Sequence, residues 1–321
     1  MEKTIPIIYA CNDNVVNLCS VSIASIIENA SDKNKYNIYV FHTRLAKENI
    51  NNLEDMSIQN VNVQCININK YVNFSEVYET NIYPYEMYYR YYASLILDDE
   101  KIIYLDCDTI VVGDIADLYN EELQDNPIGM VRDFTHYVDS DNYGFNSGVM
   151  LIDKKRFENM RIRERCFELL KECNKYKFPD QDALNAICKD NIKELGPEYN
   201  YQVSLAYYHK FKEKIKNKKY KNLFFNSPIV VHFSYVTKPY NNIYSKYSKQ
   251  FWQYAKKSKY YNSLLDKYLR DPYKLLKESP VEEIYLDLTK EGKVGLRKIL
   301  EIFIYQIKYW LLFKIDKGKQ T

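Results

Sequence analysis

The sequence predicts an α/β fold with one large domain followed by a smaller helical region. Two observations predict the fold: short apolar runs alternate with amphipathic stretches, and 46% of the 321 residues are hydrophobic, as in an ordinary globular protein. A third observation predicts the boundary, because Tyr- and Lys-rich amphipathic patterns begin near residue 241. Large α/β domains commonly reach about 250 residues. We therefore expect a main domain at residues 1–240 and a helical region at residues 241–321.

Four apolar runs in the first part of the chain predict buried strands, because each is short and is followed by polar or turn-forming residues. These strands are residues 5–10, 37–42, 61–66 and 101–105. The segments between them place apolar residues three and four apart, which is the spacing of a helix with one buried face. These helices are residues 15–28, 45–56 and 85–97. Such alternation implies a parallel sheet with helices on both faces.

The rest of the main domain continues with further strands and helices. The strands are residues 128–131, 149–152 and 229–232, and the helices are residues 153–174 and 180–188. Asn146, Ser147 and Gly148 form a polar entrance to the second of these strands. A glycine at such a position indicates that another group packs closely against the strand.

The charge balance and the cysteines exclude several classes of protein. Lys and Arg number 45 against 43 Asp and Glu, so the formal charge of +2 gives no general field for binding nucleic acid. The seven cysteines include no C-x-x-C pair, and residues 1–4 do not resemble a secretory signal, so we expect reduced thiols in a cytoplasmic protein. No apolar run approaches the ~18 residues of a membrane-spanning helix.

Polar residues follow two of the predicted strands, and they indicate a binding site. Asn12 and Asn14 come after the first strand, and Asp106 and Asp108 come after the fourth. In open α/β sheets, ligands bind outside the carboxyl ends of the strands, so these two loops are expected to share one pocket. If the chain stays extended, Asp106 and Asp108 point to the same side. Their carboxylates suit Mg²⁺ or Mn²⁺, although a solvated turn after a core strand is the alternative.

His232 lies at the end of another predicted strand and could add an imidazole ligand to the same cation. Two carboxylates and one histidine suit Mn²⁺ better than Mg²⁺. Lys238 follows six residues later, beside Pro239, and could contact a phosphate as a point charge. The alternative for His232 is a hydrogen-bonded structural histidine in an apolar run.

The order of these motifs resembles glycosyltransferase family 8, whose members are retaining enzymes of the GT-A type that use nucleotide sugars. The resemblance covers residues 5 to about 240. Within the family, the sequence most resembles bacterial α-galactosyl- or α-glucosyltransferases that act on lipopolysaccharide or other surface glycans. It implies a Rossmann-like GT-A fold, with a mixed sheet flanked by helices. The matching segments are Ala10-Cys11-Asn12-Asp13-Asn14, Tyr89-Arg90, Tyr104-Leu105-Asp106-Cys107-Asp108, residues 145–152, Asp180-Gln181-Asp182 and residues 232–240.

The resemblance implies a role for each matching position. Asp106, Asp108 and His232 would bind Mn²⁺, or Mg²⁺, which bridges the UDP diphosphate, and Lys238 would neutralise the departing β-phosphate. Asp106 would also touch the sugar or ribose. The residues implied to lie beside the uridine are Ala10, Cys11, Asn12 and Asn14. Those implied to surround the donor sugar are Arg90, Asn146, Ser147, Asp180 and Gln181. Three positions depart from the family pattern, namely Asn12, Val15 and Tyr235.

Retention of configuration leaves two mechanisms open, a covalent intermediate on a carboxylate or attack by the acceptor on the face that UDP leaves. Asp180 is the candidate carboxylate and Gln181 the candidate group near the reacting face. We favour same-face attack, with Asp180 as a positioning residue. Asp180-Gln181-Asp182 also fits the acidic first turn of a helix, and both interpretations can hold together.

The C-terminal segment predicts a membrane contact. Residues 290–321 contain eight Lys or Arg and three acidic residues, a net charge of +5, beside apolar residues at helical spacing. A helix of this kind suits the surface of an anionic membrane, which implies a peripheral protein on the inner face of the cell membrane. The alternative is a helix packed on the catalytic domain.

Two other functions compete with the transferase. Asp106-Cys107-Asp108 resembles the nucleophile motif of haloacid-dehalogenase-type phosphatases, but about 100 residues of α/β pattern precede it and residues 190–235 lack the later acidic pair. A non-catalytic protein that binds glycans or membranes would fit the 33 tyrosines. The presence of Asp108, His232 and Lys238 argues against it.

Overall fold

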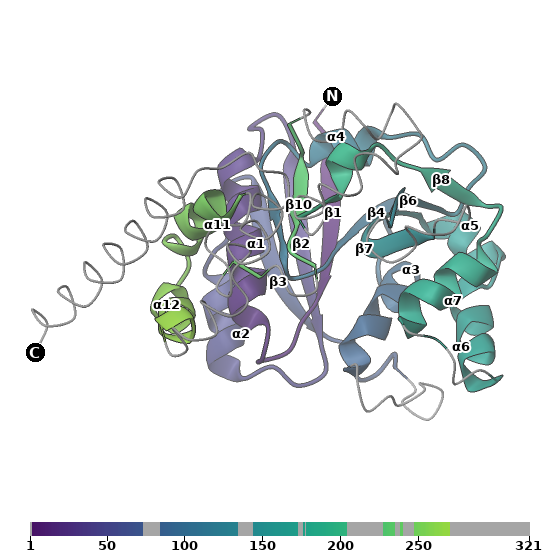
Figure 1. Cartoon of the computed structure of the whole chain (residues 1–321), viewed down its shortest axis with the longest axis horizontal. Coiled ribbons are helices and arrows are strands. Elements are labelled where there is room, and N and C mark those ends of the chain that lie inside the picture. Colours follow the sequence, from purple (N-terminus) through teal and green to yellow (C-terminus); the bar gives the residue numbers. More distant parts are fainter. Residues whose placement is uncertain are drawn as a thin grey trace, which may run out of the picture. The chain divides into compact units, whose positions relative to one another are not determined.

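A seven-stranded mixed sheet with helices on both faces forms the centre of the protein, and a three-stranded sheet lies beside it (Figure 1). The computed structural model describes residues 2–72, 84–133, 144–172, 176, 178–203, 227–234, 238–239 and 247–269. All of them belong to one compact unit, Met1–Arg270. The predicted α/β class is confirmed.

The central sheet has the strand order β3-β2-β1-β4-β7-β6-β8. Its strands are β1 (Thr4–Ala10), β2 (Lys35–His42), β3 (Val61–Asn67), β4 (Lys101–Leu105), β6 (Ile128–Arg132), β7 (Phe145–Asp153) and β8 (Ile192–Glu194). The predicted parallel arrangement is right for β3, β2, β1 and β4. β7 runs antiparallel to both β4 and β6, so the sheet is mixed, as the family resemblance implied.

Apart from α4, which was not predicted, the helices of this part of the chain lie at the predicted positions, but not always with the predicted type. They are α1 (Val16–Asn29), α2 (Lys47–Glu54), η1 (Tyr85–Tyr92), α3 (Ala93–Ile96), α4 (Ala116–Asn120), α5 (Lys154–Asn159), α6 (Ile162–Glu172) and α7 (Pro179–Ile187). The predicted helix at residues 85–97 is mostly a 3-10 helix, in which five consecutive residues are buried, so tertiary packing overrides the amphipathic pattern. The predicted helix at residues 153–174 breaks at Arg161, whose φ of 52° is left-handed.

The core lies on both faces of the sheet, because successive side chains of a strand point to opposite sides. Ile7 and Tyr9 of β1 pack with α1 and α2 on one face. Ile8, together with Tyr104 of β4, packs with η1, α6 and α7 on the other. Burial on both faces explains why these strands read as continuous apolar runs rather than as alternating ones.

The smaller sheet consists of β5 (Thr109–Val111), β10 (Val230–His232) and β9 (Tyr201–Gln202). β10 runs antiparallel to β5, and His232 lies opposite Thr109. Since β5 begins directly after the turn that follows β4, this pairing brings the end of β10 to that turn. The sequence predicted β10 but not β5 or β9, which are too short to show periodicity.

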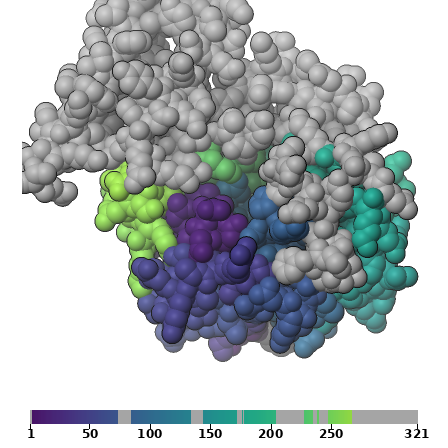
Figure 2. Space-filling model, turned by 90° about the horizontal axis from the view of Figure 1, so that it is seen from below, coloured from purple at the N-terminus to yellow at the C-terminus, as the bar shows by residue number. Residues whose placement is uncertain are grey.

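Two helices beyond residue 240 pack on α1. They are α11 (Ser248–Ala255) and α12 (Tyr261–Leu269), drawn in yellow-green beside the purple N-terminal segment (Figures 1 and 2). Asn29 Nδ2 donates a hydrogen bond of 3.0 Å to the Tyr254 hydroxyl, and Ser20 Oγ one of 3.0 Å to Ser258 Oγ. The domain division at residue 240 remains a prediction. Residues 290–321 lie outside the described residues, and no helix within the described part is long and apolar enough to cross a membrane.

Candidate functional site

The site forms along one edge of the central sheet. β1, β4 and β6 run in the same direction and end at this edge, whereas β7 runs oppositely and begins there. The loop after β1 and the turn after β4 are therefore neighbours, as the sequence predicted. Cys107 Sγ donates to the Ala10 carbonyl at 3.2 Å, and this contact joins the two loops directly.

Asp106, Asp108 and His232 converge at this edge, with one ligand atom of each within 4.8 Å of the others. His232 Nε2 lies 3.2 Å from Asp108 Oδ1 and 3.8 Å from Asp106 Oδ2. The extended geometry expected for the two aspartates is wrong, because the chain turns here: Thr109 N donates to the Asp106 carbonyl at 3.2 Å. Two carboxylates and one imidazole are a donor set that suits a divalent cation such as Mn²⁺.

His232 is held in the form that a metal ligand needs. Burial lowers its pKa, although the charges of Asp106 and Asp133 oppose the shift, so the imidazole is neutral at pH 7. Nδ1 lies 3.1 Å from Asn200 Oδ1. Since that amide oxygen only accepts, Nδ1 carries the proton and the Nε2 lone pair faces the carboxylates.

Arg90 forms ion pairs with two carboxylates of the site, those of Asp106 and Asp180. Its guanidinium lies 3.0 Å from Asp106 Oδ1 and 3.2 Å from Asp180 Oδ2, and its side chain is 5% exposed. It also donates to the Ser147 carbonyl at 2.5 Å and lies 4.3 Å from the centre of the Tyr104 ring. Arg90 is therefore a buried residue of the site and not an exposed residue on the surface of a helix.

The pKa values of the two carboxyls that contact Arg90 are shifted in opposite directions. Burial raises the pKa of Asp106, but the positive charges of Arg90 and Lys238 and the hydrogen bond from Tyr104 outweigh burial and lower it overall. Burial also raises the pKa of Asp180, and there the charge of Arg90 does not outweigh it. Of these two carboxyls, Asp106 is therefore the one whose negative charge its surroundings stabilise more.

Asn146, Ser147 and Gln181 form a buried amide network. Gln181 Oε1 accepts from Asn146 Nδ2 and from Ser147 N, each at 3.2 Å, and Gln181 Nε2 donates to Asp133 Oδ2 at 2.9 Å. Ser147 Oγ donates to Asp180 Oδ2 at 3.1 Å. Every polar atom of the Gln181 side chain is therefore fixed in direction by its partners.

The two acidic residues of α7, Asp180 and Asp182, have different contacts. One lies in the site, and the other stabilises the start of the helix. The Asp180 side chain contacts Arg90 and Ser147 in the site. Asp182 Oδ2 instead accepts a hydrogen bond of 3.0 Å from Phe178 N at the start of the helix. The capping function thus belongs to Asp182, and Asp180 is available to the site.

Gly148 shows why the strand entrance needs a glycine. A Cβ added there would lie 2.3 Å from His232 Cε1 and 2.7 Å from Asp106 Oδ2, which is closer than atoms can approach. The close contact predicted from the sequence is confirmed, and the group that approaches is the cluster itself.

Lys238 contacts the cluster from the chain after β10. Its Nζ forms an ion pair with Asp108 and donates to the Phe233 carbonyl at 2.8 Å. Burial lowers the pKa of Lys238 to about 8, although the charge of Asp106 opposes the shift. Tyr235, one of the departures from the family pattern, lies outside the described residues.

The residues expected beside uridine lie at the same edge but farther out. Ala10 ends β1, and Cys11 is buried behind it. Asn12 is half-buried and Asn14 is exposed. Asn12 Oδ1 accepts a hydrogen bond of 2.9 Å from Asn14 N. This bond stabilises the conformation of the loop after β1.

Three residues of the site were missed from the sequence. The Tyr104 hydroxyl donates to Asp106 Oδ1 at 2.6 Å, and Asp133 is fully buried beside Gln181. Asn200 Nδ2 donates to Asn146 Oδ1 at 2.8 Å while its oxygen contacts His232. Asp133 directly follows β6, so the strand-edge argument could have found it. Asn200 lies in an irregular segment with no pattern to mark it.

The fold and the site are typical of α/β enzymes that bind a divalent cation and an anionic ligand at the carboxyl edge of the sheet. Within that class, the chain belongs to glycosyl transferase family 8, because the family model matches residues 6–244. This membership confirms the resemblance predicted from the motifs, and it does not favour the phosphatase.

Known relatives agree with this assignment. Glycosyltransferase GlyF of Streptococcus pneumoniae serotype 4 is 30% identical over 67% of this chain, which spans about half (52%) of GlyF. A lipopolysaccharide 1,2-glucosyltransferase of Escherichia coli is 29% identical over 75% of this chain and 74% of its own. The crystal structure of the galactosyltransferase LgtC, at 22% identity, shares the fold with a TM-score of 0.63 over 79% of this chain and 96% of LgtC. The predicted GT-A fold is thereby confirmed.

Proposed function

We propose that this protein is a retaining hexosyltransferase that moves galactose or glucose from UDP-galactose or UDP-glucose to a glycan acceptor. The observation that carries the proposal is the convergence of Asp106, Asp108 and His232 at the sheet edge, in a chain of family 8. The acceptor we propose is a bacterial cell-surface polysaccharide or lipopolysaccharide, since one relative is a lipopolysaccharide glucosyltransferase. The reaction would depend on Mn²⁺ or Mg²⁺.

The leaving group would be UDP, and its developing negative charge is what the site must stabilise. Asp106, Asp108 and His232 would hold the cation, which when bound acts as a Lewis acid toward the diphosphate and contributes several kcal/mol. Lys238 would add a second positive charge beside Asp108. Its pKa of about 8 keeps most of the ammonium protonated at pH 7.

The donor sugar would lie against the network of Arg90, Asp180, Asn146, Ser147 and Gln181. Asp180 Oδ2 already accepts from Arg90 and Ser147, so this oxygen is occupied by partners. A carboxylate held in this way is better placed to orient a neighbour than to attack carbon. This supports same-face attack, with Asp180 as a positioning residue.

Asp180→Asn is expected to lower kcat by about 10²-fold, the scale of a small misplacement of reacting groups. Loss of a covalent nucleophile would lower kcat by about 10⁶-fold and would contradict the positioning role. Initial rates of UDP release at saturating donor distinguish the two. Asp182→Asn is the matched control, because this neighbouring carboxylate contacts the start of α7 and not the site. Its kcat should match that of the wild type.

Asn200→Ala is expected to weaken Mn²⁺ binding by about 10- to 100-fold, because His232 loses the partner that directs Nε2 toward the aspartates. Calorimetric titration with Mn²⁺ in the presence of saturating UDP measures the change. Asn29→Ala is the control, since Asn29 also forms several partly buried hydrogen bonds but joins α1 to β5 and α11. Equal Mn²⁺ affinity in the two variants would show that Asn200 does not position His232.

The proposed function is tested by UDP release from a panel of UDP-sugars with Mn²⁺, Mg²⁺ or EDTA. Metal-dependent hydrolysis of one UDP-hexose would support the transferase and name the donor. No turnover of any UDP-sugar, together with no binding of UDP in the presence of Mn²⁺, would contradict it. Phosphatase substrates and glycan binding would then be the next assays.

We also propose that residues 290–321 bind an anionic membrane surface and place the protein on the inner face of the cell membrane. The support is the net charge of +5 in this segment, which lies outside the described residues. Sedimentation with vesicles that contain phosphatidylglycerol should capture the full chain at low salt. A chain truncated after residue 289 should remain in the supernatant, and its capture would contradict the proposal.

A further inference from the structure

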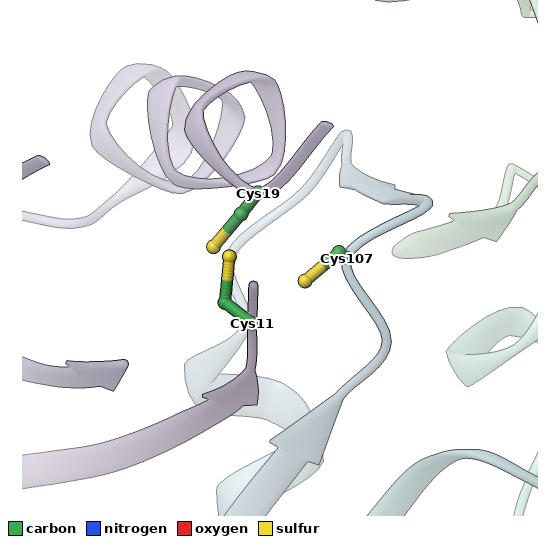
Figure 3. A group of neighbouring side chains, drawn as sticks. All are labelled: Cys11, Cys19 and Cys107. Carbon is green, nitrogen blue, oxygen red and sulfur yellow. The ribbon is translucent and has the colours of Figure 1, made fainter. Parts of the chain in front are cut away.

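A second cluster of ligating side chains lies behind the acidic one. The sulfur atoms of Cys11, Cys19 and Cys107 lie within 4.8 Å of one another. They come from three separate elements, the end of β1, the first turns of α1 and the turn after β4, and Figure 3 shows all three side chains pointing toward one another. Cys11 and Cys19 are 1% and 0% exposed, and Cys107 is 8% exposed.

Two of the three thiols also have fixed hydrogen-bond partners in the backbone. Cys107 Sγ donates to the Ala10 carbonyl at 3.2 Å, and Cys11 Sγ donates to the Asn12 carbonyl at 3.4 Å. The three sulfur atoms are buried beside one another, which distinguishes this cluster from three isolated core cysteines.

We infer that Cys11, Cys19 and Cys107 form a binding site for one thiophilic cation of the Cu(I), Zn(II) and Cd(II) class. Thiolates prefer such soft ions, whereas the carboxylates of Asp106 and Asp108 prefer Mg²⁺ or Mn²⁺. Three sulfur atoms at about 2.3 Å from one ion are about 4 Å apart. The observed separations do not exceed 4.8 Å, so one ion can be reached by all three sulfur atoms after a shift of less than about 1 Å in any separation that is too long.

Binding at this site needs no redox step. Each of the three thiols forms a sulfur–metal bond and releases its proton to solvent, and the ion keeps its oxidation state. The site is built from different side chains than the Mn²⁺ site of the proposed function. The inference and the proposed function can therefore fail independently.

Cadmium is the probe, because cadmium thiolates have an ultraviolet charge-transfer absorption. The full-length protein, reduced with a phosphine, is titrated with Cd²⁺ in excess Mg²⁺, which saturates hard oxygen sites. We expect one Cd²⁺ per chain in the wild type and at least tenfold weaker binding in Cys19→Ala. Cys166→Ala is the matched control, since Cys166 is equally buried but belongs to the core on the other face of the sheet. It should bind Cd²⁺ as the wild type does.

Two further variants control for binding at the acidic cluster and for a failure of Cys19→Ala to fold. Asp108→Asn should retain the cadmium absorption even where it loses Mn²⁺ binding, because Asp108 belongs only to the acidic cluster. Where circular dichroism shows that Cys19→Ala does not fold, Cys11→Ala takes its place. Equal cadmium absorption in the wild type and in the folded Cys19 or Cys11 variant would overturn the inference. Loss of absorption in Cys166→Ala would also overturn it.

Discussion

Asp108→Asn is expected to lower the rate of UDP-sugar turnover by about 10³-fold. The change keeps the shape of the side chain but removes the charge that faces His232 at 3.2 Å and pairs with Lys238. A Lewis-acidic cation contributes several kcal/mol to such a reaction, and each 1.36 kcal/mol corresponds to about tenfold in rate. Turnover is measured as UDP release, with Mn²⁺ varied from micromolar to millimolar.

Asp114→Asn is the matched control for Asp108→Asn. Asp114 lies six residues farther along the chain, and its carboxylate accepts hydrogen bonds from the Tyr36 hydroxyl and from Ala116 N. It has a structural role without contact to the cluster, so its turnover should stay near that of the wild type. If Asp108→Asn kept the wild-type rate at all Mn²⁺ concentrations, Asp108 would not be a ligand of a catalytic cation.

Arg90→Met is expected to lower the free energy of unfolding by about 3–5 kcal/mol at pH 7. Removal of the guanidinium leaves Asp106 and Asp180 close together in the protein interior with their shared cation gone. Urea denaturation followed by circular dichroism measures the change. Arg156→Met is the control, because Arg156 pairs with Asp153 at a site where the arginine side chain is 39% exposed. Its cost should stay below about 1 kcal/mol.

The loss in Arg90→Met should depend on pH in a defined direction. Without the guanidinium, the pKa of Asp180, which burial already raises, lies farther above its value in the unfolded chain, and Asp106 loses one of the charges that lower its pKa. Such groups bind more protons when folded, so the variant regains stability as the pH falls from 7 toward about 4. A loss that stayed constant over this range would show that the cost comes from packing around Arg90 rather than from unpaired charge.

The sequence predicted the long elements of this fold because they repeat a spacing over many residues. β1 and α1 agree with the prediction within a residue or so at each end. The three-residue β5 and the two-residue β9 carry no such repeat, yet together with β10 they place His232. β5 and β9 exist because neighbouring strands hold them, whereas β10, which is as short as β5, was predicted from the apolar run that leads to His232.

Some residues of the candidate site could be predicted from the sequence and others could not, for the same reason. Asp106, Asp108 and His232 could be predicted because each follows a recognisable strand or lies within a known motif. The turn that makes the aspartates converge could not, since it depends on hydrogen bonds to residues that are remote in sequence, such as the one from Phe233 N to the Asp108 carbonyl. Asn200 contacts the site from the junction between a short 3-10 helix, Pro197–Tyr199, and β9, and no motif in the sequence marks this junction.

The ion pair between Lys238 and Asp108 has a consequence for the order in which ligands bind. A cation bound by Asp108 would compete with the ammonium group for the same carboxylate, so its affinity includes the cost of displacing Lys238. A diphosphate offers the displaced ammonium a new partner and removes that cost. Cation and nucleotide are then thermodynamically linked, and each should tighten the binding of the other by the same factor. The free protein would hold its cation weakly, and the nucleotide would bring the two together.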